Sequence, residues 1–233
     1  MKNRFVWLLL YILTIGGTIL LVHYGSQAVT AMAENIPVHR AHCIVIDAGH
    51  GGEDGGAVSC TGKMESNYNL EIALRMNDIL NFMGYETKMI RVTDVSVYKK
   101  GETLAQKKAS DLKERVRIVR ETPAAVLVSI HQNQFPDGRY HGAQVFYADT
   151  PGSKMLATQL QTALVEHLNP GSRRKAKLSS GVYLMEHIPC TGILIECGFL
   201  SNFEEEAKLA APAYQKKLCS VIAASLDQFF VSA

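Results

Sequence analysis

From residue 42 onward, short apolar runs alternate with helical stretches, and this alternation constrains the fold more than any other feature. In the helical stretches, apolar residues recur every three or four positions, as on the buried face of an amphipathic helix. Such alternation is typical of a parallel sheet covered by helices on both faces. We therefore expect a single-domain α/β fold with a mostly parallel, twisted sheet of about six strands. The predicted strands are 42–47, 85–91, 125–130, 143–147, 182–185 and 192–196, and the predicted helices begin near Asn67 and cover about 103–121, 153–168 and 213–230.

The first 33 residues form a separate segment. Lys2 and Arg4 precede an almost unbroken apolar run over 5–22, a pattern found in secretory signal peptides and signal anchors. Residues 31–33 read Ala-Met-Ala, which matches an A-x-A cleavage site. We therefore expect export, with the segment either cleaved or retained in contact with the membrane through residues 5–22. A tether over 34–41 and a single globular domain over 42–233 would follow.

The charge balance argues against nucleic acid as a partner. Removing Lys2 and Arg4 with the first segment from the 24 basic residues leaves 22, which equals the 22 acidic residues. Nucleic-acid binding depends on neutralising phosphates and normally shows as a basic surplus. This surplus is absent.

A glycine-rich segment, IDAGHGGEDGGA over 46–57, follows the first predicted strand. It does not fit the dinucleotide motif G-x-G-x-x-G, because Asp54 stands where the third glycine would be. A P-loop around Gly62-Lys63 is also excluded, since Ala57 and Met64 replace the required glycine and the required serine or threonine. Glycines here would instead let the chain turn sharply and let a substrate approach closely.

Four ionisable residues stand at strand ends or at a helix start. His50, His131 and Glu196 each follow or end a predicted strand, and Glu65 lies where the first helix begins. Ligands of parallel α/β sheets bind beyond the carboxyl ends of the strands. Two histidines and a carboxylate with one open position form a catalytic zinc site, and a second carboxylate can then transfer the proton of a water. This pattern predicts one zinc ion per chain.

The same residues carry a family resemblance. The segments VIDAGHGGEDGGA, KMESNYNLEIAL, VSIHQN and ILIECGFLSNFEEEAKL resemble the four signatures of zinc-dependent N-acetylmuramoyl-L-alanine amidases, in the order of the family. The resemblance implies that His50, Glu65 and His131 bind zinc and that Glu196 is the catalytic acid and base. Two departures, Ala48 for the usual proline and Gln134 for a small residue, change no donor atom.

A narrower resemblance concerns the biological setting. The stretch LAQKKASDLKERVRIV over 104–119, with a hydrophobic segment before a single domain, is similar to the sporulation amidases of endospore formers. This implies removal of stem peptides from muramic acid so that muramic-δ-lactam can form in the spore cortex. The enzyme would then be extracytoplasmic, in the space between the two membranes of the developing spore. Because the chain has no wall-binding repeats, an extracytoplasmic helper protein is a possible partner.

Three further residues and one segment have two interpretations each. Asp47 and Asn133 would orient the zinc ligands by hydrogen bonds or satisfy the local backbone. Arg115 would contact acidic groups of the substrate or form a salt bridge on its helix. The basic cluster SRRKAK, 172–177, would be a solvated loop or a docking site.

The expected reaction is hydrolysis of the amide bond between N-acetylmuramic acid and L-alanine in peptidoglycan. One alternative is a non-catalytic protein that binds or regulates the wall on the same fold, and such a protein would be expected to have lost a ligand or the general base. A second alternative is a zinc peptidase that cleaves within the stem peptide. Analysis of the products distinguishes the two enzymatic activities.

Overall fold

The computed structural model describes residues 2–34 and 39–232, and the chain divides into one unit over Met1–Val38 and another over His39–Ala233. The described part of the first unit is the helix α1 (Lys2–Glu34), on which apolar side chains such as Trp7 and Leu21 are exposed. Within the described residues, no helix is both long enough and apolar enough to span a bilayer. Of the expected tether, residues 35–38 lie outside the described residues, and 39–41 belong to the first strand.

The second unit is built on a six-stranded sheet in the order β2-β1-β3-β6-β4-β5, which confirms the expected α/β class. Every pair of neighbouring strands is parallel except β4 and β6, which run antiparallel to each other. The strands are β1 (His39–Ala48), β2 (Tyr85–Met89), β3 (Ala125–Asn133), β4 (Gln144–Tyr147), β5 (Lys177–Leu178) and β6 (Gly192–Phe199).

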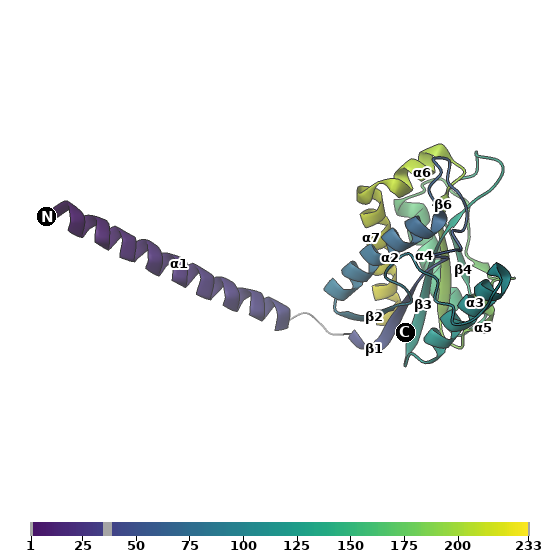
Figure 1. Cartoon of the computed structure of the whole chain (residues 1–233), viewed down its shortest axis with the longest axis horizontal. Coiled ribbons are helices and arrows are strands. Elements are labelled where there is room, and N and C mark those ends of the chain that lie inside the picture. Colours follow the sequence, from purple (N-terminus) through teal and green to yellow (C-terminus); the bar gives the residue numbers. More distant parts are fainter. Residues whose placement is uncertain (1, 35–38, 233) are drawn as a thin grey trace. The chain divides into compact units, whose positions relative to one another are not determined.

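Helices cover both faces of this sheet (Figure 1), as the sequence predicted. Because side chains alternate along a strand, Ile44 and Ile46 of β1 join the core beneath α2, α4 and α7, whereas Val45 joins the core beneath α3 and α5. A short helix, α6, follows β6. The helices of this unit are α2 (Glu65–Phe82), α3 (Leu104–Arg120), α4 (Ser153–His167), α5 (Tyr183–His187), α6 (Phe203–Ala210) and α7 (Pro212–Ser232).

The prediction of a strand over 182–185 is wrong. This stretch belongs to helix α5, which buries Leu184 and Met185 against the sheet. The strand at this edge is instead β5, whose Lys177 and Leu178 are both exposed. A four-residue apolar run fits a buried helical turn as well as a strand, and an exposed two-residue strand carries no apolar pattern.

The strand directions bring several loops to one edge of the sheet. The parallel strands β1, β3 and β6 end there, and His131 and Glu196 are register neighbours. Because β4 is antiparallel to β6, Gln144 at the start of β4 lies opposite Glu196. Since β5 is parallel to β4, the chain before Lys177 enters at this edge as well.

Candidate active site

The structure brings His50, Glu65 and His131 into one cluster at this edge. The Glu65 carboxylate lies between the two imidazoles, with Oε2 3.3 Å from His50 Nε2 and Oε1 3.0 Å from His131 Nδ1. One donor atom from each residue lies within 4.8 Å of the others. This set of two nitrogens and a carboxylate is the chemistry that a catalytic zinc ion prefers.

Glu65 is fixed by its place as the first residue of α2. The positive end of the helix dipole favours a carboxylate there, and Oε2 accepts from the backbone N–H of Ala57 at 3.0 Å. Its Oε1 accepts from Asn69 Nδ2 and from the Gln132 N–H, both at 3.1 Å. Burial raises the pKa of Glu65, but the adjacent imidazoles outweigh burial and hold it below its usual range. Glu65 is therefore ionised, as a metal ligand must be.

Two glycines leave the space that these side chains occupy. A Cβ on Gly49 would lie 2.1 Å from Nε2 of His131. A Cβ on Gly56, which has a φ of +69°, would lie 2.6 Å from Oε2 of Glu65. The sequence suggested that glycines here admit a substrate, and the structure adds that they make room for the protein's own side chains.

His50 has a left-handed backbone with a φ of 61°, and two buried arginines hold the chain around it. Such a conformation is uncommon for residues other than glycine, and it persists only where the surroundings enforce it. Arg91, 3% exposed, donates from Nε to the Ala48 carbonyl at 2.8 Å and from Nη2 to the Gly49 carbonyl at 3.0 Å. Arg115, 2% exposed, donates from Nη2 to the His50 carbonyl at 2.7 Å. The two guanidinium groups thus bind three successive carbonyls.

Arg115 is therefore part of the scaffold, since it forms buried ion pairs with Asp47 and Asp111. Burial lowers the pKa of Arg115, but these two carboxylates outweigh it and raise the pKa above its usual value. Asp47 accepts a hydrogen bond from Arg115 and another, at 2.6 Å, from Ser129 Oγ. Burial raises the pKa of Asp47, but Arg115, His131 and Ser129 outweigh burial and lower the pKa below its usual value. Asp47 thus braces β1 against α3 and β3.

Asn133 is the last residue of β3, two residues beyond His131. Its backbone carbonyl accepts from the N–H of Leu200 at 2.8 Å, which ties the end of β3 to the chain after β6. This contact uses the main chain of Asn133, so the two interpretations of its side chain both stay predictions.

Asp54 is a site residue that the sequence analysis did not select. Its Oδ2 lies 3.0 Å from Nδ1 of His50 and 3.2 Å from Nζ of Lys108 on α3. Burial lowers the pKa of His50, but Glu65 and Asp54 outweigh burial and raise it. A carboxylate on the far ring nitrogen fixes the tautomer and orientation of a metal-binding histidine. The four-residue spacing of His50 and Asp54 in a glycine-rich loop is the signal that could have indicated this pair.

Glu196 lies on β6 beside His131. Its Oε2 is buried and has no hydrogen-bond partner among the described residues. Burial, opposed by His131 and reinforced by Glu65, raises its pKa from 4.5 to about 7. An unpaired buried oxygen next to the donor cluster fits a bound cation with its water, and a pKa near neutrality suits a group that both accepts and donates a proton.

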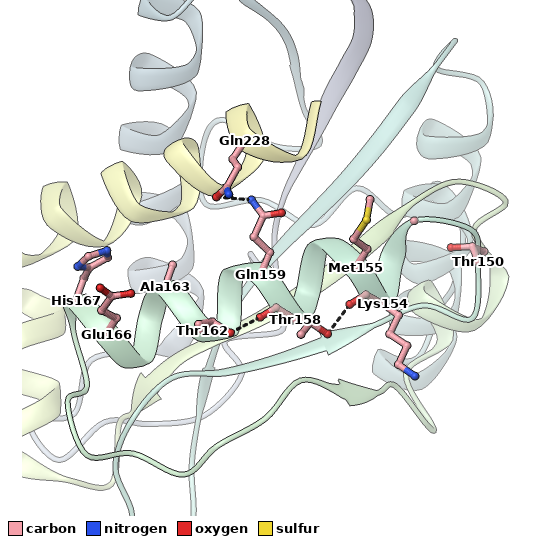
Figure 2. A pocket seen from close by; sticks show the side chains of 11 residues that line it. Thr150, Lys154, Met155, Thr158, Gln159, Thr162, Ala163, Glu166, His167 and Gln228 are labelled. Atoms are coloured by element: carbon pink, nitrogen blue, oxygen red, sulfur yellow. Dashed lines mark hydrogen bonds between the residues drawn. The ribbon is translucent and has the colours of Figure 1, made fainter. Parts of the chain in front are cut away.

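A large surface depression lies elsewhere, over α4 and next to α7 (Figure 2), with a volume of about 880 Å³. Several of its polar groups are hydrogen-bonded within the fold. Gln159 donates to Gln228 at 2.9 Å, and the hydroxyls of Thr158 and Thr162 donate to backbone carbonyls one turn earlier. No convergent set of reactive groups lines this depression among the described residues, whereas the His50 cluster brings three possible metal ligands together.

Comparisons with known proteins agree with the family resemblance of the sequence. A family profile described as N-acetylmuramoyl-L-alanine amidase matches residues 44–228. The chain is similar to the germination-specific N-acetylmuramoyl-L-alanine amidase of Bacillus subtilis (strain 168), with 38% identity over 190 residues that cover 80% of this chain and 79% of the relative.

Two solved structures share the fold. The CwlD amidase from Clostridioides difficile, in complex with the GerS lipoprotein, has a TM-score of 0.79 and 34% identity and covers 82% of this chain and 100% of its own. An N-acetylmuramoyl-L-alanine amidase from Clostridium difficile 630 has a TM-score of 0.71 and 30% identity and covers 82% of this chain and 97% of its own.

Proposed function

This chain belongs to the N-acetylmuramoyl-L-alanine amidase family, and we propose that it cleaves peptidoglycan with one zinc ion held by His50, Glu65 and His131. The bond hydrolysed is the amide between N-acetylmuramic acid and L-alanine. The observation that carries this proposal is the convergence of three donor atoms beside the buried, unpaired Oε2 of Glu196.

In this proposal the protein's own groups divide the work. The zinc ion that His50, Glu65 and His131 would hold would supply Lewis acidity toward the scissile carbonyl and a water. His50 offers Nε2, because Asp54 engages Nδ1, and His131 offers Nδ1. Glu196 accepts the proton of the water and delivers it to the departing amine of L-alanine. Its pKa of about 7 in the metal-free protein lies near neutrality, so the carboxyl group can both accept and donate a proton.

We further propose that the activity serves muramic-δ-lactam formation in the spore cortex. The relative in Bacillus subtilis is named as germination-specific, and the Clostridioides difficile structure contains a lipoprotein partner. The first supports a role in spores, and the second supports a helper protein; the enzyme would then work outside the cytoplasm, between the two spore membranes. Residues 1–33 would direct export, and 42–233 would form the catalytic domain.

Product analysis with purified protein tests the reaction. Peptidoglycan fragments should yield new amino termini on L-alanine, and activity should disappear with a chelator and return with zinc. Glu196→Gln should keep one zinc per chain and lose turnover. New termini elsewhere in the stem peptide would identify a peptidase, and bound zinc without any peptide release would identify a non-catalytic wall-binding protein.

Mass spectrometry of spore peptidoglycan tests the biological role. A strain lacking this protein should lose muramic-δ-lactam, and the wild-type gene should restore it, whereas Glu196→Gln should not. Normal lactam content in the deletion strain would refute the cortex role and leave the amidase assignment intact.

A further inference from the structure

Two loops that carry no zinc donor meet at the edge of the sheet where Glu196 lies. The first, residues 134–143, leads into β4, and the second contains the basic cluster 172–177 and leads into β5. Gln144, the first residue of β4, lies opposite Glu196. Lys177, the first residue of β5, pairs with Phe146, two residues further along β4, so Arg174 precedes β5 at the same edge and lies beside the first loop. Phe199, which Arg174 contacts, lies three residues beyond Glu196 at the end of β6, or about 10 Å along that strand.

Arg174 differs from the rest of the basic cluster because it is half-buried and held in place. Its guanidinium lies 5.0 Å from the ring centroid of Phe199, and its Nε donates to the His141 carbonyl at 3.1 Å. Among the described residues, Arg174 has no carboxylate partner. The neighbouring Arg173 is exposed. The structure thus fixes one arginine whose terminal nitrogens form no ion pair and no hydrogen bond among the described residues.

The surroundings of Arg174 form a pocket. Asp137, Arg139, Tyr140 and His141 line this pocket together with Arg174, and its volume is about 400 Å³. The only carboxylate among them, Asp137, is paired with Arg139 through contacts of 2.7–3.1 Å, so its charge is already compensated. The net character of the pocket is therefore positive.

The first loop is ordered by contacts with the chain after β6, although it exposes apolar rings. The N–H of Phe135 donates to Ser201 Oγ at 3.1 Å, and Asn202 Nδ2 donates to the Gly138 carbonyl at 2.8 Å. Phe135 and Tyr140, 45% and 47% exposed, pack edge to face with their ring centroids 4.5 Å apart. An anchored loop with exposed aromatic rings beside a fixed arginine has the composition of a ligand-contacting surface.

We propose that Arg174, stacked on Phe199, binds a free carboxylate of the stem peptide, and this inference rests on the proposed function. The N-acetylated sugars of the glycan strand carry no charge, so the anionic groups of an amidase substrate belong to its peptide. An extended peptide advances about 3.3–3.6 Å per residue. A span of about 10 Å from Glu196 therefore places Arg174 about three residues along a stem peptide that begins at the scissile bond. Arginine is suited to this role because its planar fork matches a carboxylate.

A matched pair of substrates tests the proposal. Zinc-loaded protein is given a muropeptide with free stem carboxylates and the same muropeptide with those groups converted to carboxamides. We expect wild-type protein to prefer the free-carboxylate substrate by about tenfold in kcat/KM, mainly through KM, the lower end of what a charge-assisted contact provides. Arg174→Met keeps an apolar stem over Phe199 and should bring the ratio of the two kcat/KM values close to one.

Arg173→Met is the control, because it removes the same charge from the same loop at an exposed position and should keep the wild-type ratio. Thermal unfolding of each variant identifies any loss of folded protein. A ratio near one for wild-type protein, or an unchanged ratio in Arg174→Met, would overturn the role of Arg174 while leaving the amidase assignment intact. Failure of wild-type protein to cleave either substrate would instead overturn the proposed function.

Discussion

The pKa of Glu196 gives a quantitative prediction about stability. The carboxyl has a pKa of about 7 in the folded, metal-free protein, against 4.5 for the ordinary group. The folded state therefore binds the proton more tightly than the unfolded state, and the free energy of unfolding falls as the pH rises between these values. Since one pKa unit corresponds to about 1.4 kcal/mol, the full penalty at alkaline pH is about 3 kcal/mol, and most of it develops between pH 5 and pH 8.

Glu196→Gln removes this titration and keeps the size of the side chain. Burying the glutamine amide changes the free energy of unfolding by the same amount at every pH, so the experiment compares how this free energy depends on pH in the two proteins. We expect urea denaturation of the metal-free proteins to show that the variant gains about 2–3 kcal/mol relative to wild-type protein between pH 5 and pH 8. Zinc should reduce this gain, because a cation beside Glu196 favours its ionised form. Parallel stability curves for the two metal-free proteins would refute the reasoning.

Three further changes test the scaffold of the site. Asp54→Ala removes the partner of His50 Nδ1 and should weaken zinc binding by about 10- to 100-fold in competition with a chromophoric chelator, and an unchanged affinity would contradict the orienting role. Gly56→Ala should lower the free energy of unfolding by more than Gly62→Ala does. Both positions have positive φ, but only the first places its Cβ against a zinc-site side chain, so equal losses in urea denaturation would show that the close approach has no cost. Arg115→Met leaves a buried carboxylate unpaired and should cost about 3–5 kcal/mol at neutral pH. This loss should shrink in acid, where that carboxylate is protonated, and a loss independent of pH would argue against the ion pair as its cause.

Much of the site could be predicted because its residues adjoin buried strands. His131 and Glu196 directly follow or end short apolar runs that predict strands, and parallel strands bring such positions to one edge. Asp54 was not predicted because it contributes no metal-ligand atom and lies in a loop whose sequence has no hydrophobic periodicity. Arg91 was assigned to the end of a strand, where nothing in the sequence shows that its guanidinium turns inward to backbone carbonyls.

The edge strands illustrate the other limit of the sequence. The run at 182–185 has the apolar character of a strand and the length of a helical turn, and tertiary packing against Leu194 and Leu127 decides between them. β5 is held by its pairing with β4, and neither of its residues is buried. Pairing partners that lie about 30 residues apart leave no local signature.

The reversal of β4 and β5 relative to the other four strands divides the sheet across its width. The groups that would hold and activate zinc come from β1, α2, β3 and β6, whereas the loops that surround Arg174 are delivered by β4 and β5. The lengths and charges of these two connections can therefore diverge between related enzymes while the reaction chemistry is inherited unchanged. A new preference for one wall composition over another would require only replacement of surface segments, with no rebuilding of the metal centre.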